Sequence, residues 1–191
     1  MTKDRMMLSN KSSALGVVVL SMAFLGSGSG FRAQQEVITE TKTFLTRDAV
    51  HPGETFRAAL RLSIGPDWHI NANPVNDNFL VATMLEFPEG RNFKPVNIIY
   101  PPPLPARFEF SEVEVLVYAE SVLIGVLFQA GDMVLPGTYK LHGALTYQAC
   151  NDKSCLPPET LNVEFEVKVV DFETPTRAVN AEIFSRIRFV N

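Results

Sequence analysis

The chain contains two cysteines, Cys150 and Cys155, and they are the residues whose chemistry is easiest to recognise. They lie five positions apart, and four polar residues separate them. A chain that turns over these four residues brings the two Cα atoms within the roughly 4.4 to 6.8 Å that a disulfide requires. The spacing therefore allows a disulfide, which is either a structural link or a redox pair that exchanges with other thiols.

The small size of the ring bears on this choice. Closing a loop of about six residues removes only roughly 2 kcal/mol of unfolded-state entropy, against ~4.7 kcal/mol for a loop of a hundred residues. A chain long enough to bury a large core gains little from such a link. A short ring beside a polar loop is typical of labile, exchangeable disulfides. Both interpretations remain open at this level.

Other chemistries find little support in the sequence. His51, His69 and His142 are scattered and give no ligand spacing with the cysteines, so we predict no metal site. A redox pair of cysteines would need no cofactor, because its sulfurs carry the chemistry. No Gly-x-Ser-x-Gly element is present for a hydrolase. The formal net charge is -4, and Lys and Arg do not cluster after the first dozen residues, which argues against a nucleic-acid partner.

The amino terminus predicts export. Lys3, Arg5 and Lys11 precede the apolar run 14–25, and small residues follow it at 26–30. This layout is typical of a secretory signal, which we place at residues 1–33, with an uncleaved anchor as the alternative. Export would put both cysteines in an oxidising compartment, the bacterial periplasm, where a disulfide persists.

The elements that must position the cysteines are predicted to be strands. Apolar and polar residues alternate with period two along several runs, which places alternate side chains on one face of a sheet. Turn signals such as Pro136-Gly137 separate the runs. We predict about eight strands in an all-β, antiparallel β-sandwich over residues 34–170. The predicted strands are 37–45, 56–64, 81–87, 96–100, 113–117, 122–128, 139–147 and 161–169.

Three segments lack the alternating pattern. Residues 67–78 are rich in Asn and Asp, and residues 101–110 are rich in proline, so both are predicted to be surface loops. Residues 171–191 are predicted to be a carboxy-terminal tail or a short helix with Ile183, Phe184 and Ile187 on one side.

Four segments in sequence order resemble one known family, the amino-terminal periplasmic domains of the thiol/disulfide interchange protein DsbD. They are TYQACNDKSCLPPET (146–160), DWHINANP (67–74), FLVAT (79–83) and IYPPP (99–103). The Tyr-Gln-x-Cys and Cys-x-Pro-Pro elements are the most specific. The resemblance implies an immunoglobulin-like sandwich with the cysteine pair on adjacent strands at one end.

The resemblance also implies roles for single residues. Cys155 matches the cysteine that forms the mixed disulfide with a partner, and Cys150 matches the one that resolves it. Phe110, or alternatively Phe108, matches the aromatic cap over the sulfurs. Further residues predicted to line the site are Glu109, His69, Asn71 and Tyr147.

The family resemblance implies a redox relay that passes two electrons from a membrane-embedded thiol reductase to periplasmic thioredoxin-fold proteins. The sequence stops at Asn191 without a membrane domain, so we expect that reductase to be a separate protein. A monomer is predicted, because the sulfurs must be exposed to different partners in turn. The alternative hypothesis is a non-catalytic immunoglobulin-like binding module with a structural disulfide.

Overall fold

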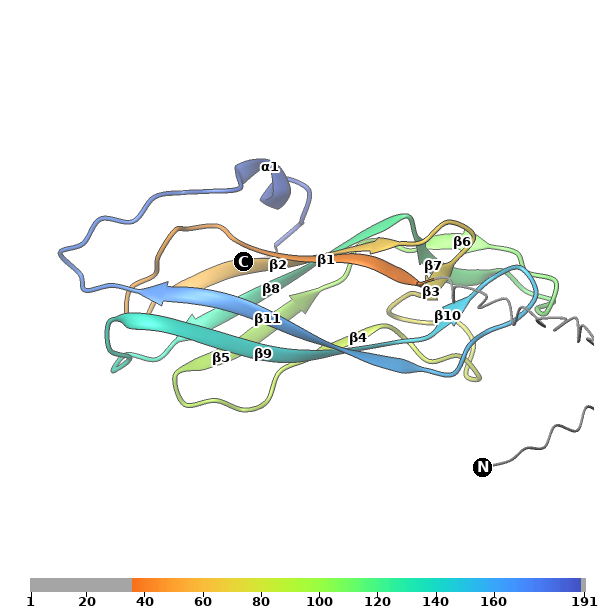
Figure 1. The fold of residues 1–191 in the computed structure, drawn as a ribbon, viewed down its shortest axis with the longest axis horizontal. Helices are drawn as coiled ribbons and strands as arrows, with labels where there is room; N and C mark the ends of the chain where they lie inside the picture. Colours follow the sequence, from red (N-terminus) through yellow and green to blue (C-terminus); the bar gives the residue numbers. More distant parts are fainter. Residues whose placement is uncertain (1–35, 190–191) are drawn as a thin grey trace, which may run out of the picture. The chain divides into compact units, whose positions relative to one another are not determined.

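The chain folds almost entirely as antiparallel strands (Figure 1). The computed structural model describes residues 36–189, so the signal peptide predicted at 1–33 lies outside the described residues. The described part contains the strands β1 (Ile38–Leu45), β2 (Thr55–Ile64), β3 (His69–Asn71), β4 (Met84–Glu86), β5 (Phe93–Ile99), β6 (Leu104–Ala106), β7 (Val115–Ala119), β8 (Ser121–Ala130), β9 (Gly137–Tyr147), β10 (Ala149–Cys150) and β11 (Glu159–Val169), and the short helix α1 (Ala181–Phe184).

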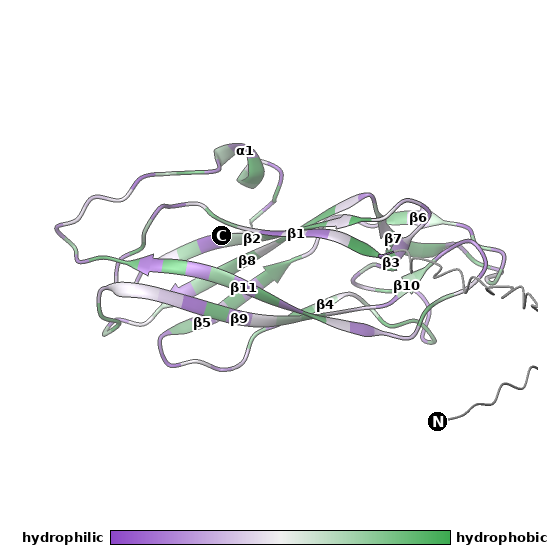
Figure 2. Cartoon of the chain, viewed as in Figure 1, coloured by the Kyte–Doolittle hydropathy of each residue, from purple (hydrophilic) through white to green (hydrophobic). Residues whose placement is uncertain are grey.

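Two sheets of long strands enclose the main core. One sheet has the order β1-β2-β8-β5, and the other has the order β11-β9-β4. Their inner faces carry the apolar members of each alternating run, and the alternation along β11 is visible in Figure 2. Phe128 of β8 meets Phe165 of β11 edge to face, with ring centroids 6.0 Å apart. The predicted all-β, immunoglobulin-like sandwich is confirmed.

A third, smaller sheet with the order β10-β3-β7-β6 forms one end of this sandwich (Figure 1). Three strands of the small sheet lie next to long strands in the sequence, separated by short interruptions. β3 follows β2, β7 precedes β8, and β10 follows β9. Two interruptions contain residues in the left-handed region, Asp67 (φ 66°) and Glu120 (φ 57°). The eight runs expected from the sequence correspond to β1, β2, β4, β5, β7, β8, β9 and β11, and the three further strands, β3, β6 and β10, all belong to the small sheet.

Two predicted surface loops contain strands instead. The stretch 67–78 includes β3, where Ile70 and Asn71 are fully buried between β10 and β7. The stretch 101–110 includes β6, which pairs with β7 and contains Pro105. A proline is tolerated there because β6 is an edge strand, so the missing N–H donor would have faced solvent. Both predictions were wrong over three residues each, because the local pattern does not reveal that these short segments pair with β7.

The carboxy-terminal segment packs on the outside of the β1-β2-β8-β5 sheet. The Val179 N–H donates to the Thr46 carbonyl, and Ile183 of α1 is buried. A Cβ at Gly125 of β8 would lie 2.7 Å from Cγ2 of Ile187, so only glycine allows this close approach. The described part of the segment is therefore attached to the domain and includes the short helix. Among residues 36–189, no helix combines the length and the apolar character needed to cross a membrane.

Candidate redox site at the cysteine hairpin

Cys150 and Cys155 form a disulfide across a tight hairpin. The Asn151 N–H donates to the Ser154 carbonyl at 2.9 Å, and the Leu156 N–H donates to the Ala149 carbonyl at 2.8 Å. These two bonds flank the cysteines and make them a non-hydrogen-bonded antiparallel pair, the kind whose side chains approach most closely. Their Cα atoms are 4.0 Å apart, slightly below the window expected from the sequence.

The turn of the hairpin is held by one side chain. Oδ1 of Asn151 accepts hydrogen bonds from the backbone N–H groups of Lys153 and Ser154, both at 3.0 Å. Such a bond pattern lets an asparagine mimic a backbone turn, and it brings the two cysteines face to face. Asp152 and Lys153 are exposed at the tip.

The two cysteines differ in accessibility. Cys150 is only 1% exposed, whereas Cys155 is partly exposed at the hairpin edge. A partner's sulfur can therefore approach Cys155 more readily than Cys150. This asymmetry agrees with the roles that the sequence suggested, attack at Cys155 and resolution by Cys150, which stay predictions.

Strand β3 places two polar side chains beside Cys150. His69 lies directly opposite Cys150 in the register, and Asn71 lies two residues further along the same face. Oδ1 of Asn71, a fully buried residue, is 3.8 Å from Sγ of Cys150. Nδ1 of His69 is buried without a hydrogen-bond partner in the described structure. Both residues that were predicted to line the site contact or neighbour the pair.

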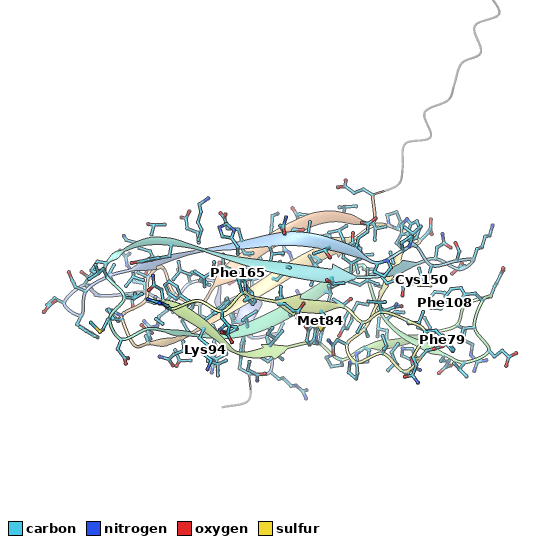
Figure 3. All side chains as sticks on the ribbon, turned by 90° about the horizontal axis from the view of Figure 1, so that it is seen from below. Phe79, Met84, Lys94, Phe108, Cys150 and Phe165 are labelled. Carbon is cyan, nitrogen blue, oxygen red and sulfur yellow. A yellow bond between two sulfur atoms is a disulfide. The ribbon has the colours of Figure 1, made fainter. Side chains whose placement is uncertain are left out.

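An aromatic layer covers His69. Phe108, buried to 6% exposure, meets the His69 ring edge to face with centroids 5.4 Å apart. Phe110 stacks on the outer side of Phe108 at 5.1 Å and is 39% exposed. Figure 3 shows Phe108 at the same end of the domain as Cys150. The inner ring is thus Phe108, and Phe110, the first candidate from the sequence, forms the outer one.

The loop that carries these rings is tied to the hairpin. The Glu109 N–H donates to the carbonyl of Asp152 at 3.1 Å, so the backbone contacts the tip beside the cysteines. The Glu109 side chain is exposed. The backbone of this loop is therefore fixed to the tip of the cysteine hairpin by a hydrogen bond.

Tyr147 joins the site to the main core. Its ring is buried, and its hydroxyl donates to Oε2 of Glu159 at 2.8 Å across the β9-β11 pair. Burial and the hydrogen bond to the Glu159 carboxylate both raise the pKa of Tyr147 above its usual value. The hydroxyl therefore remains a hydrogen-bond donor across the physiological range.

Sequence reasoning missed Gln148 as a site residue. Its Oε1 accepts hydrogen bonds from Nδ2 of Asn71 at 3.0 Å and from the Val81 N–H at 2.9 Å, and its Nε2 donates to the Leu156 carbonyl at 3.1 Å. Gln148 thus connects β3, the segment before β4 and the chain after Cys155. Its position inside the Tyr-Gln-x-Cys element was the available signal.

No group of three or more His, Cys, Asp or Glu side chains that could hold a metal ion occurs within residues 36–189. The chemistry available at the hairpin is that of its two sulfurs. A disulfide with one accessible sulfur and one shielded sulfur is suited to exchange with an external thiol through a mixed disulfide.

The chain is similar to one known protein family and to several solved structures. Residues 34–167 match the family model described as "Thiol:disulfide interchange protein DsbD, N-terminal". Similar solved structures include the DsbD amino-terminal domain of Neisseria meningitidis in the reduced form (13% identity, 74% of this chain and 90% of that chain, TM-score 0.41). Another is the amino-terminal periplasmic domain of ScsB from Proteus mirabilis (14% identity, 80% of this chain and 56% of that chain, TM-score 0.45). No curated protein matches the sequence.

Proposed function

The chain belongs to the family of DsbD amino-terminal domains, and from this membership we propose that it is a periplasmic electron relay that works through Cys150 and Cys155. Membership supports a role in thiol/disulfide exchange. The relay would accept two electrons from a membrane-embedded thiol reductase and pass them to thioredoxin-fold proteins in the periplasm.

The observation that carries the proposal is the unequal burial of the two bonded cysteines. Cys155 is open to a partner, whereas Cys150 is covered on the sheet side by His69 and Asn71. A link whose only purpose is stability gains nothing from leaving one sulfur accessible. The small ring also contributes little to stability, about 2 kcal/mol at most.

Electrons and bonds balance in this scheme. In the reduced protein, the Cys155 thiolate attacks the disulfide of the partner, one sulfur of that partner leaves as a thiolate, and a mixed disulfide forms. Cys150 then gives up its proton to that thiolate, and its sulfur attacks Sγ of Cys155. The Cys150–Cys155 bond forms, and the partner leaves with both sulfurs reduced, so two electrons have moved and no cofactor is needed.

The experiment has two arms, equilibrium and trapping. We expect the reduction potential of the pair, measured in glutathione or dithiothreitol buffers, to lie well above the roughly −300 mV typical of structural disulfides. We also expect Cys150→Ser to accumulate a mixed disulfide with a thioredoxin-fold protein through Cys155. The Cys155→Ser variant is the matched control and should trap none.

A potential below about −300 mV together with no trapped adduct would overturn the relay. That result would favour the binding module with a structural disulfide. Periplasmic location is tested separately, by fractionating cells that express the full chain. Sedimentation of the purified protein tests the monomer.

A further inference from the structure

Two side-chain amides, the fully buried Asn71 and the half-buried Gln148, form a short chain that ends at Cys150. Nδ2 of Asn71 donates to Oε1 of Gln148 at 3.0 Å and to the Val81 carbonyl at 3.1 Å. Oδ1 of Asn71 faces the other way, 3.8 Å from Sγ of Cys150. Asn71 is itself fully buried, so water does not compete for this oxygen.

The backbone determines which atom of each amide points where. The Val81 N–H needs an acceptor and the Leu156 carbonyl needs a donor, so Gln148 must direct Oε1 to the first and Nε2 to the second. Asn71 then faces two acceptors, Oε1 of Gln148 and the Val81 carbonyl, and only its NH₂ group satisfies them. Its oxygen must therefore face the sulfur. A flipped amide would leave several half-buried groups without partners.

We propose that Asn71, held by Gln148, is a positioning residue that keeps Cys150 protonated in the reduced protein and so leaves the attacking role to Cys155. In the disulfide, Sγ of Cys150 carries no proton, so Oδ1 of Asn71 lies near it without accepting a hydrogen bond. After reduction, the Cys150 thiol can donate its proton to Oδ1 of Asn71. A carbonyl oxygen accepts this bond but repels a thiolate, so it favours the protonated form.

This inference rests on the proposed function, because it divides the two steps of exchange between the cysteines. The Cys155 thiolate attacks the partner while the Cys150 thiol stays bonded to Asn71. Once the mixed disulfide has formed, the Cys150 proton passes to the thiolate that the partner has released. The freed sulfur then closes the Cys150–Cys155 bond. Early attack by Cys150, from the buried side of the pair, is suppressed.

Other titratable groups surround Cys150 and must be held constant in a test. His69 faces it from β3, and Cys155 faces it from the returning arm of the hairpin. Asp152 and Lys153 lie exposed at the tip, and Glu109 is exposed on the loop bonded to that tip. All except Cys155 are unchanged in the variants below.

The test measures the appearance of the Cys150 thiolate with pH, by ultraviolet absorbance, in the full chain carrying Cys155→Ser. Adding Asn71→Ala removes the oxygen and leaves a polar space where water can donate to a thiolate. We expect the acid dissociation constant of Cys150 to rise about three- to tenfold, as for one lost hydrogen bond. Asn73→Ala is the matched control, because Nδ2 of Asn73 also donates to a backbone carbonyl, that of Thr83, in the same segment.

The proposal would be overturned if Asn71→Ala and Asn73→Ala gave equal titration curves for Cys150 while both kept native near-ultraviolet circular dichroism. If Asn71→Ala does not fold, the Asn71 side-chain carbonyl resonance of the protein with both cysteines is followed by NMR during reduction and titration. The chemical shift of this resonance should change as the Cys150 thiol forms and ionises. A chemical shift that stays constant would equally overturn the proposal. No partner is present in either measurement, so a failed relay and a failed Asn71 role remain distinguishable.

Discussion

The long-strand part of the sandwich and the small cysteine sheet use buried positions differently. Along β11, every second residue from Val163 to Val169 is apolar and buried, and its neighbours are exposed. Along β3, one apolar residue lies between His69 and Asn71, and the buried asparagine is satisfied by hydrogen bonds. The first region gains stability from hydrophobic burial. The second region buries a polar side chain that is paired by hydrogen bonds and lies beside Sγ of Cys150.

The largest expected effect comes from a substitution that destabilises the core of the long-strand region alone. Phe165→Ala removes a fully buried ring that contacts Phe128 and Phe87, so we expect a loss of about 3 to 5 kcal/mol in the free energy of unfolding. Urea denaturation measures it. The exposed Phe172 provides the control, and Phe172→Ala should change stability by less than about 0.5 kcal/mol. The reduction potential of the folded Phe165→Ala protein should stay unchanged, and a large shift would contradict the separation of the two regions.

The second effect separates the two candidate caps. Phe108→Ala removes the ring that contacts His69, whereas Phe110→Ala removes only the outer ring. Because Phe108 packs in a small cluster with Val115 and Val117, we expect a loss near the lower end of core substitutions, about 3 kcal/mol. We also expect faster reduction of the disulfide by dithiothreitol in Phe108→Ala than in Phe110→Ala. The reverse order would favour Phe110 as the residue that covers the disulfide.

The third effect tests what the disulfide contributes to the fold. Replacing both cysteines, in Cys150→Ala/Cys155→Ala, should lower the free energy of unfolding by about 2 kcal/mol or less, as expected for a ring of about six residues. Chemical denaturation of the oxidised protein and of the double variant gives the difference. The retained hydrogen bonds of Asn151 and Leu156 should keep the hairpin closed. A loss as large as that of Phe165→Ala would support the structural-link interpretation.

Comparison of the two regions also explains what the sequence could predict. The alternating runs were recognisable because one face of each long strand meets the core, and the cysteine pair was recognisable from its motif. His69, Ile70 and Asn71 looked like a loop, because a strand that buries an amide needs partners from distant segments. Those partners, Val81 and Gln148, lie 10 and 77 residues from Asn71. Burial of Phe108 beneath Phe110 depends on the same long-range assembly.

The smallest effect concerns Tyr147, which belongs to both regions because its ring packs in the main core and its hydroxyl bonds Glu159 beside the hairpin. Tyr147→Phe keeps the ring and removes one hydrogen bond, so we expect a loss of about 0.5 to 1.5 kcal/mol at neutral pH.

The pH dependence of this loss has a definite sign. Because the folded protein raises the pKa of Tyr147, the native state holds that proton more tightly than the unfolded chain does. The contribution is therefore complete below the unfolded value of about 10 and declines as the pH rises above it. Tyr100 and Tyr118, whose pKa values are also raised, are present in both proteins and cancel in the difference. The stability gap between wild type and Tyr147→Phe should thus be constant up to about pH 10 and narrow beyond it. A gap that widens with pH would mean that the phenolate, rather than the phenol, is the form stabilised beside Glu159.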